Sequence, residues 1–196
     1  MTATIRLATE DDAGHVQAIY GPFCSTPVSF EGEAPSRDEM RRRIAALSGR
    51  IPWLICDEGG KVLGYAYASP HRARVAYQWS VEVSAYVAEG LRRRGIGRAL
   101  YTSLLRTLTL QGYANAYAGI TLPNAASVGL HEAVGFRPIG VYRGIGYKLG
   151  AWHDVGWWEL ALCEKRPEPP APTELRTLVG TPDWQAALTA GLAQLR

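Results

Sequence analysis

The stretch from Trp79 to Leu110 constrains the fold of this chain more than any other part of its sequence. Apolar residues fill the odd positions up to Val87, while the even positions carry polar side chains such as Glu82. This alternation is typical of a strand with one core face and one polar face. From Ile96 onward, leucines follow at steps of four until Gly112 provides a stop, which predicts an amphipathic helix. A long helix therefore follows a half-buried strand.

The turn between this strand and this helix has a composition that suits anion binding. It reads Arg92-x-x-Gly95-x-Gly97, so backbone N–H groups at the helix start can converge on an anion without interference from Cβ atoms. The helix dipole adds to this attraction. A Gly-Lys-Ser/Thr string and the three-glycine spacing of a dinucleotide fold are both missing, which excludes those two motifs. We predict a phosphate-binding turn; the alternative is a tight turn with arginines in solvent.

The remaining sequence before residue 165 indicates further short helices and strands. Capping signals at Thr9 and Ser36 predict two early helices, separated by a loop from Gly21 to Pro35 that is rich in proline, serine and glycine. Asn124 predicts the cap of a later helix that ends at Gly135. Strands are predicted at 4–7, 53–56, 62–68, 79–87, 115–120, 139–143 and 155–162, with turns at Gly144, Gly146 and Gly150 between the last two.

Charge and cysteine content exclude several classes of protein. Lysine and arginine number 21 against 18 acidic residues, a net charge of +3, which is too small to indicate a nucleic-acid binder. No stretch approaches the roughly 18 apolar residues of a membrane span, and the start of the chain lacks an export signal. The three cysteines form no CxxC pair, which argues against a disulfide framework or a zinc site. We expect a cytoplasmic protein without a metal.

The length of 196 residues fits one compact domain followed by a tail. Proline is frequent from Arg166 to Pro172, and such a composition makes a semi-rigid linker. We place the domain at 1–164 and the linker and tail at 165–196. Within the tail, the segment from Pro182 to Leu195 predicts a short amphipathic helix that packs on the domain or on a second subunit.

Several strings in the sequence resemble one superfamily of enzymes. Arg92-x-x-Gly95-x-Gly97 between a strand and a long helix, followed by Asn124, resembles the GCN5-related N-acetyltransferases (GNAT). Over roughly Ile5 to Leu162, longer strings are similar to the phosphinothricin N-acetyltransferase-like subfamily. These strings include Pro52-Trp53-Leu54, Gly64-Tyr65-Ala66-Tyr67-Ala68, Leu122-Pro123-Asn124, His131-Glu132-Ala133 and Trp152-His153-Asp154-Val155-Gly156.

This resemblance implies a fold and a co-substrate. The fold is α/β (α+β): a mixed, mostly antiparallel central sheet, flanked by helices and splayed so that acetyl-CoA enters the gap as a pseudo-strand. The end of the polar-faced strand would pair with the pantetheine arm, the glycine turn would hold the pyrophosphate, and Asn124 would touch the pantetheine. The implied acetyl-CoA-binding residues are Ala85, Tyr86, Val87, Arg92, Arg93, Arg94, Gly95, Ile96, Gly97, Arg98 and Asn124.

The resemblance also implies which groups move protons. Glu82 is similar to the general base of the subfamily, which takes the ammonium proton directly or through a water; the alternative is a solvated strand glutamate. His131 stands seven residues after Asn124, where many members have a tyrosine near the sulfur. It is a candidate to protonate the leaving thiolate or to relay a proton, with a structural role as the alternative. His15 and His71 have no metal-ligand partner at a useful spacing.

The implied substrate is a small amino acid of the phosphinothricin, methionine sulfone or methionine sulfoximine type. Arg72 and Arg74 are candidates to pair with its carboxylate or oxygens, although Arg-x-Arg is also common in solvated turns. Tyr77 and Phe30 are further candidates for the pocket wall. Alternatives are an acetyltransferase for a protein N-terminus, a polyamine or an aminoglycoside, and a non-catalytic acetyl-CoA-binding module, against which Glu82 argues. The resemblance implies a homodimer; nucleic acid and membranes are not expected as partners.

Overall fold

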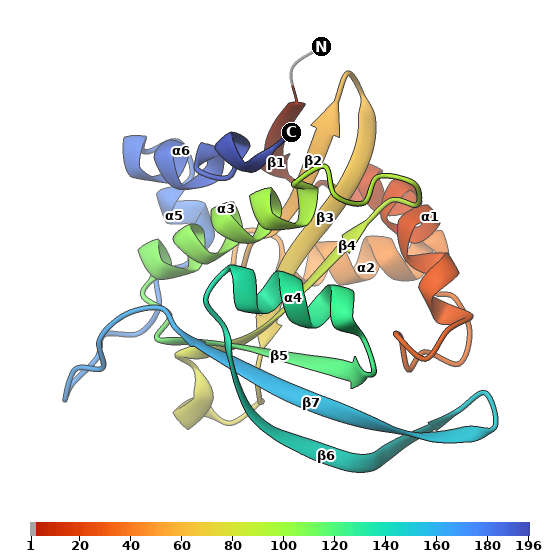
Figure 1. Cartoon of the computed structure of the whole chain (residues 1–196). Helices are drawn as coiled ribbons and strands as arrows, with labels where there is room; N and C mark the ends of the chain where they lie inside the picture. Colours follow the sequence, from red (N-terminus) through yellow and green to blue (C-terminus); the bar gives the residue numbers. More distant parts are fainter. Residues whose placement is uncertain (1–2) are drawn as a thin grey trace.

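The computed structural model describes residues 3–196 and contains a seven-stranded sheet flanked by helices (Figure 1). The strand order is β1-β2-β3-β4-β5-β7-β6, and every neighbouring pair is antiparallel except β4 with β5. This confirms the predicted mixed, mostly antiparallel sheet. The strands are β1 (Ala3–Leu7), β2 (Trp53–Glu58), β3 (Lys61–Pro70), β4 (Ser80–Val87), β5 (Asn115–Leu122), β6 (Arg137–Lys148) and β7 (Ala151–Ala161).

Helices cover both faces of the sheet because the central strands are apolar on both sides. On β2, Leu54 and Cys56 pack with the long helix α3 in one cluster, whereas Trp53 and Ile55 pack with α1 and α2 in a second cluster. Alternating side chains of a strand point to opposite faces, so one run of buried residues serves both layers. The helices of this part are α1 (Ala13–Cys24), α2 (Arg37–Leu47), α3 (Ile96–Gln111) and α4 (Ala125–Ala133).

The sheet opens between its two parallel strands. β4 and β5 pair only where Ser80–Glu82 lie beside Asn115–Tyr117. Beyond Glu82, β4 continues to Val87 and β5 to Leu122, and Figure 1 shows the two strands diverging. Within residues 3–196, the open edge of β4 from residue 83 onward has no partner strand. Unpaired backbone groups at such an edge accept an additional strand.

The segment after residue 165 packs on the outer surface of α3 (Figure 1). It contains α5 (Leu175–Leu178), α6 (Pro182–Thr189) and a short 3-10 turn (Leu192–Gln194). Leu175, Trp184 and Leu188 belong to the main hydrophobic cluster. The hydroxyl of Ser103 on α3 donates to the carbonyl of Leu188 over 2.7 Å and accepts from the N–H of Gly191 over 3.0 Å.

Two predicted boundaries are wrong. The loop expected from Gly21 begins only after Cys24, because α1 continues through Pro22. Proline removes one hydrogen bond to the preceding turn, and the helix ends two residues later. Gly144 and Gly146 lie within β6, at a register shift against β7, and the hairpin turns at residues 149–150, which both have positive φ.

No helix within residues 3–196 has the length and apolar character needed to cross a bilayer.

Candidate functional site

The glycine turn after β4 begins α3 with a left-handed residue. Gly95 has a φ of 78°, and Arg93 also has a positive φ of 65°. A residue with a Cβ adopts this region at a cost, which glycine avoids. The N–H groups of the first helical turn, from Ile96 to Arg98, have no acceptor inside the helix. They therefore remain available to an anion in the predicted position.

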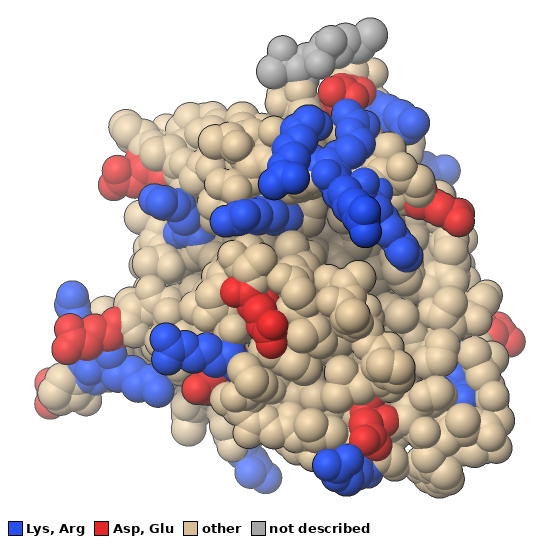
Figure 2. Space-filling model, in the orientation of Figure 1, with Lys and Arg blue, Asp and Glu red and all other residues tan. Residues whose placement is uncertain are grey.

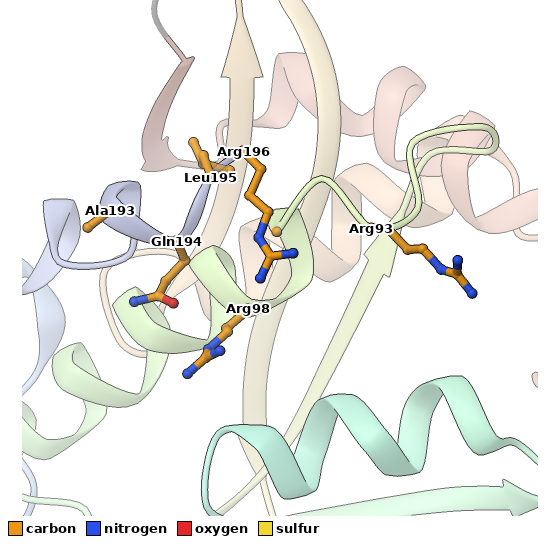
Figure 3. Close-up of a pocket in the computed structure, with 7 residues that line it drawn as sticks. Arg93, Arg98, Ala193, Gln194, Leu195 and Arg196 are labelled. Carbon is orange, nitrogen blue, oxygen red and sulfur yellow. The ribbon is translucent and has the colours of Figure 1, made fainter.

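Arginines surround this turn and give it a positive charge. Arg93, Arg98 and Arg196 line a cavity of about 400 Å³, together with Gly95 and residues 193–195. Figure 3 shows the side chains of Arg98 and Arg196 reaching this cavity from α3 and from the end of the 165–196 segment. In Figure 2, a cluster of basic side chains lies above a hollow in this face of the molecule. The structure thus brings cationic side chains to the turn that is predicted to bind phosphate.

The predicted pantetheine contacts lie along one path from this turn. Residues 85–87 form the open edge of β4 and lead directly into the turn. Asn124 caps α4, where its Oδ1 accepts from the N–H of Ser127 over 3.1 Å. A Cβ on Gly97 would lie 3.0 Å from the side chain of Leu130 on α4, so this glycine permits α3 and α4 to approach closely. The predicted pantetheine residues 85–87 therefore lie on the unpaired end of β4, and Gly97 lies against the helix that Asn124 caps.

Glu82 lies where the two parallel strands separate. It is the last paired residue of β4, opposite Tyr117 of β5, and its side chain is 32% exposed. Its Oε1 lies 2.9 Å from Nδ1 of His71 and accepts a hydrogen bond from Nη1 of Arg72 over 3.0 Å. Within residues 3–196, Oε2 receives no hydrogen bond. Glu82 is thus a carboxylate with one oxygen held by two donors, and its role as general base stays a prediction.

His71 is a site residue that the sequence analysis missed. Its side chain is 16% exposed, and its ring stacks on Tyr117 with the centroids 4.8 Å apart. The rings of Tyr77 and Trp157 meet it edge-on at 5.9 and 6.1 Å. The pairing of Ser69 with Glu82 on neighbouring strands places residue 71 beside the carboxylate. That register was the missing signal, because nine residues of irregular chain separate the two strands.

The predicted acceptor residues fall into two groups. Arg72 and Tyr77 lie beside the Glu82–His71 pair, whereas Arg74 is exposed and its carbonyl accepts from the N–H of Tyr77. Phe30 comes from the loop after α1, and its ring packs so closely on Gly146 of β6 that a Cβ there would collide with it. A cavity of about 330 Å³ lies on the same face of the sheet as Glu82. Its walls include Tyr20, Met40, Arg43, Trp53, Tyr65, Tyr67 and Ser69.

His131 is buried on α4, and both of its ring nitrogens have partners. Nδ1 lies 2.7 Å from the carbonyl of Ser127, and Nε2 lies 2.8 Å from the hydroxyl of Tyr101. The carbonyl only accepts, so we assign the proton to Nδ1 and the acceptor role to Nε2. Burial lowers the pKa of His131 below its ordinary value. The ring is therefore neutral, and its catalytic role stays a prediction.

Comparisons with known proteins agree with this geometry. Residues 5–157 match the family model described as an acetyltransferase (GNAT) domain. The chain is 42% identical to a phosphinothricin N-acetyltransferase of Streptomyces viridochromogenes, over 86% of this chain and 91% of the relative. It is 33% identical to an L-methionine sulfoximine/L-methionine sulfone acetyltransferase of Pseudomonas aeruginosa, over 86% of this chain and all of the relative.

A solved structure resembles the whole arrangement. The phosphinothricin acetyltransferase of Sinorhizobium meliloti, in complex with acetyl-CoA, superimposes with a TM-score of 0.82 at 34% identity, over 90% of this chain and 98% of that one. The family model, the sequence identities and the shared fold all indicate the same family of enzymes. The chain belongs to the GNAT acetyltransferase family, among its phosphinothricin N-acetyltransferase-like members, and is an acetyl-CoA-dependent N-acetyltransferase.

Proposed function

We propose that this enzyme acetylates the α-amino group of a small amino acid of the phosphinothricin, methionine sulfone or methionine sulfoximine type. The observation that carries the proposal is the contact between Glu82 and Arg72, 3.0 Å apart. When the carboxylate of an α-amino acid pairs with Arg72, its amino group lies close to Glu82, because the carboxylate and the amino group of the substrate are attached to the same carbon. A proton acceptor and a carboxylate binder are therefore spaced for an α-amino acid.

The residues around the opening fit acetyl-CoA. The free edge of β4 from Ala85 to Val87 offers backbone groups to the amides of the pantetheine arm. The turn at Gly95 offers N–H groups to the pyrophosphate, and Arg93 and Arg98 offer positive charge. When bound, acetyl-CoA supplies the activated acetyl group, and these contacts orient it towards Glu82.

Glu82 begins the chemistry in this proposal. Its free Oε2 accepts the proton of the substrate ammonium, directly or through a water, which leaves a neutral amine. The amine nitrogen forms a bond to the acetyl carbon while the carbon–sulfur bond breaks. The second proton of the nitrogen passes to the departing thiolate, and Glu82 then gives its proton to the solvent. Backbone N–H groups near Val87 polarise the carbonyl oxygen, a contribution of about 3 kcal/mol for one donor. His131 stays a candidate for the relay of this proton, which would pass through Nε2 because the carbonyl of Ser127 holds the proton of Nδ1.

The charge near Glu82 favours an anionic acceptor over a polycation. Arg72 already lies beside the carboxylate, and Arg74 stands exposed two residues further along the same loop. Two guanidinium groups repel a polyamine or an aminoglycoside, whereas they attract a carboxylate, phosphinate or sulfone oxygen. Tyr77 borders the same space. This charge pattern supports the amino acid over the cationic acceptors.

A substrate panel tests the proposal. Release of CoA from acetyl-CoA is measured with phosphinothricin, methionine sulfone and methionine sulfoximine, and in parallel with spermidine, an aminoglycoside and a peptide with a free N-terminus. We expect the highest kcat/KM with one of the three amino acids. Highest turnover with spermidine, the aminoglycoside or the peptide contradicts the proposed acceptor but not the acetyltransferase activity.

We also propose that the enzyme is a homodimer located in the cytoplasm. The hairpin of β6 and β7 carries a set of large apolar side chains that are 51% to 69% exposed, an unusual share for a surface in water. The three cysteines of the enzyme are free thiols, which suits a reducing compartment such as the cytoplasm. Sedimentation equilibrium should give twice the chain mass, and Trp152→Glu should give a monomer. The apolar side chains are Ile139, Tyr142, Ile145, Tyr147, Leu149 and Trp152.

A further inference from the structure

We propose that His71 is a positioning residue for Glu82: its imidazole fixes the carboxylate so that Oε2 faces the amine. The inference rests on the proposed function, because it assigns Glu82 as the proton acceptor. Its basis is the 2.9 Å contact between Nδ1 of His71 and Oε1 of Glu82. The His71 side chain is mostly buried, and the Glu82 side chain is partly buried. The carboxylate is an acceptor, so Nδ1 carries the proton and donates it.

The surroundings hold the imidazole in place from three sides. Tyr117 stacks on one face at 4.8 Å, and Tyr77 and Trp157 contact its edges. The backbone adds a further restraint, since the N–H of His71 donates to the carbonyl of Ser80 over 3.2 Å. A ring held in this way has one orientation. It can therefore transmit that orientation to a glutamate, whose side chain otherwise samples many rotamers.

The two donors divide the carboxylate into a held oxygen and a free oxygen. His71 and Arg72 both contact Oε1, so two donors already occupy this oxygen. Oε2 is left as the oxygen that can receive a proton.

Two variants separate positioning from simple packing. His71→Phe keeps an aromatic ring on Tyr117 but removes the donor, whereas His71→Asn keeps an N–H close to the position of Nδ1 and loses the ring. We expect His71→Phe to lower kcat/KM for the amino acid by about 10- to 100-fold, as misplacement of a reacting group does. We expect His71→Asn to recover most of that loss, although its packing is poorer.

The split between kcat and binding gives a second readout. A misplaced carboxylate slows the chemical step, so kcat at saturating acetyl-CoA should fall in His71→Phe and stay near the wild-type value in His71→Asn. The affinity for acetyl-CoA should be unchanged in both. His15→Asn, an exposed histidine of α1, serves as the control and should behave as the wild type.

The outcomes distinguish the inference from the function on which it rests. Wild-type kcat and kcat/KM in His71→Phe overturn the positioning role, as does a kcat in His71→Asn as low as that of His71→Phe. Absence of turnover in the wild-type enzyme with every amino acid of the panel overturns the proposed function instead. Melting temperatures and acetyl-CoA titrations confirm that each variant is folded.

Discussion

Glu82 is the residue whose replacement separates chemistry from binding most directly. Glu82→Gln keeps the size of the side chain and its contact with Arg72 but removes the basic oxygen. We expect kcat to fall by about 10²- to 10⁴-fold, the usual contribution of a positioned general base. The dissociation constant of acetyl-CoA should stay near the wild-type value, because the predicted phosphate-binding turn follows the other end of β4. Steady-state kinetics and calorimetric titration measure the two quantities.

A neighbouring glutamate provides the control for this substitution. Glu89 is exposed just after β4, so Glu89→Gln removes the same charge from the same region without touching the opening of the sheet. It should leave kcat and the pH profile unchanged. Equal losses of kcat in the two variants would mean that only the charge of the region matters, and Glu82 would then lose its role as base.

His131 makes the stability of the fold depend on pH. Burial lowers its pKa in the folded state, whereas the unfolded chain takes up a proton near pH 6.5, roughly its ordinary value. As pH falls through that value, protonation favours the unfolded chain, so the wild type loses stability that it has at pH 7.5. His131→Gln lacks this dependence. We expect the unfolding free energy of the wild type minus that of the variant to be larger at pH 7.5 than at pH 5.5. Urea titration at the two pH values measures this difference.

The same variant bears on the predicted catalytic role of His131. If the imidazole gives or relays the proton to the thiolate, kcat at pH 8 should fall by about tenfold or more in His131→Gln. A glutamine retains one donor and one acceptor for Ser127 and Tyr101. Unchanged kcat would leave His131 with a purely structural role, because its two nitrogens already satisfy buried groups.

At the scale of elements, the start of α3 and its end offer a matched comparison. Gly95 and Gly112 flank the helix with φ of 78° and 88°. A Cβ on Gly95 would collide with the carbonyl of Gln194, whereas nothing lies within 4 Å of one on Gly112. Both alanine variants should lose about 1 to 2 kcal/mol through backbone strain. Only Gly95→Ala should also shift the phosphate turn, raising the dissociation constant of acetyl-CoA about tenfold or more while kcat at saturation stays within a factor of about two.

Calorimetric titration of the two variants with acetyl-CoA decides the matter. Equal weakening in Gly95→Ala and Gly112→Ala would show that helix stability, and not the shape of the turn, controls binding. Unchanged affinity in both would remove the turn from the acetyl-CoA site. A denaturant titration of each variant checks that both remain folded.

Elements with local signals were predictable, and contacts between distant elements were not. The strand up to Val87, the glycine turn and α3 follow from alternation, from glycine positions and from a spacing of four, all of which are read within one segment. The pairing of His71 with Glu82 depends on a strand register across a nine-residue connection, which no local pattern specifies. The end of α1 was predicted too early, at Gly21, because a proline indicates that a helix will end but not at which later residue it ends.

The whole molecule is held together by packing that crosses the predicted division at residue 165. Trp184 and Leu188 are 4% and 8% exposed, within the same cluster as the leucines of α3. A Cβ on Gly191 would collide with the carbonyl of Ala99, so the segment approaches α3 as closely as a glycine permits. Its last residues then reach the turn at Gly95. The packing of α6 on α3 therefore places the last residues of the segment, 193–196, at the candidate site for acetyl-CoA.

This arrangement predicts a contribution from Arg196 to binding of acetyl-CoA. Its N–H donates to the carbonyl of Arg94 over 3.1 Å, and its side chain lines the cavity that Arg93 and Arg98 share. An exposed cation beside a phosphate contributes about 0.4 to 1 kcal/mol, the upper part of the range for exposed ion pairs, so Arg196→Gln should raise the dissociation constant about two- to fivefold at low salt. High salt should reduce the difference by screening. Arg176→Gln, in the same segment but paired with Glu174, should change nothing; equal effects of the two variants would reduce Arg196 to a contribution from overall charge.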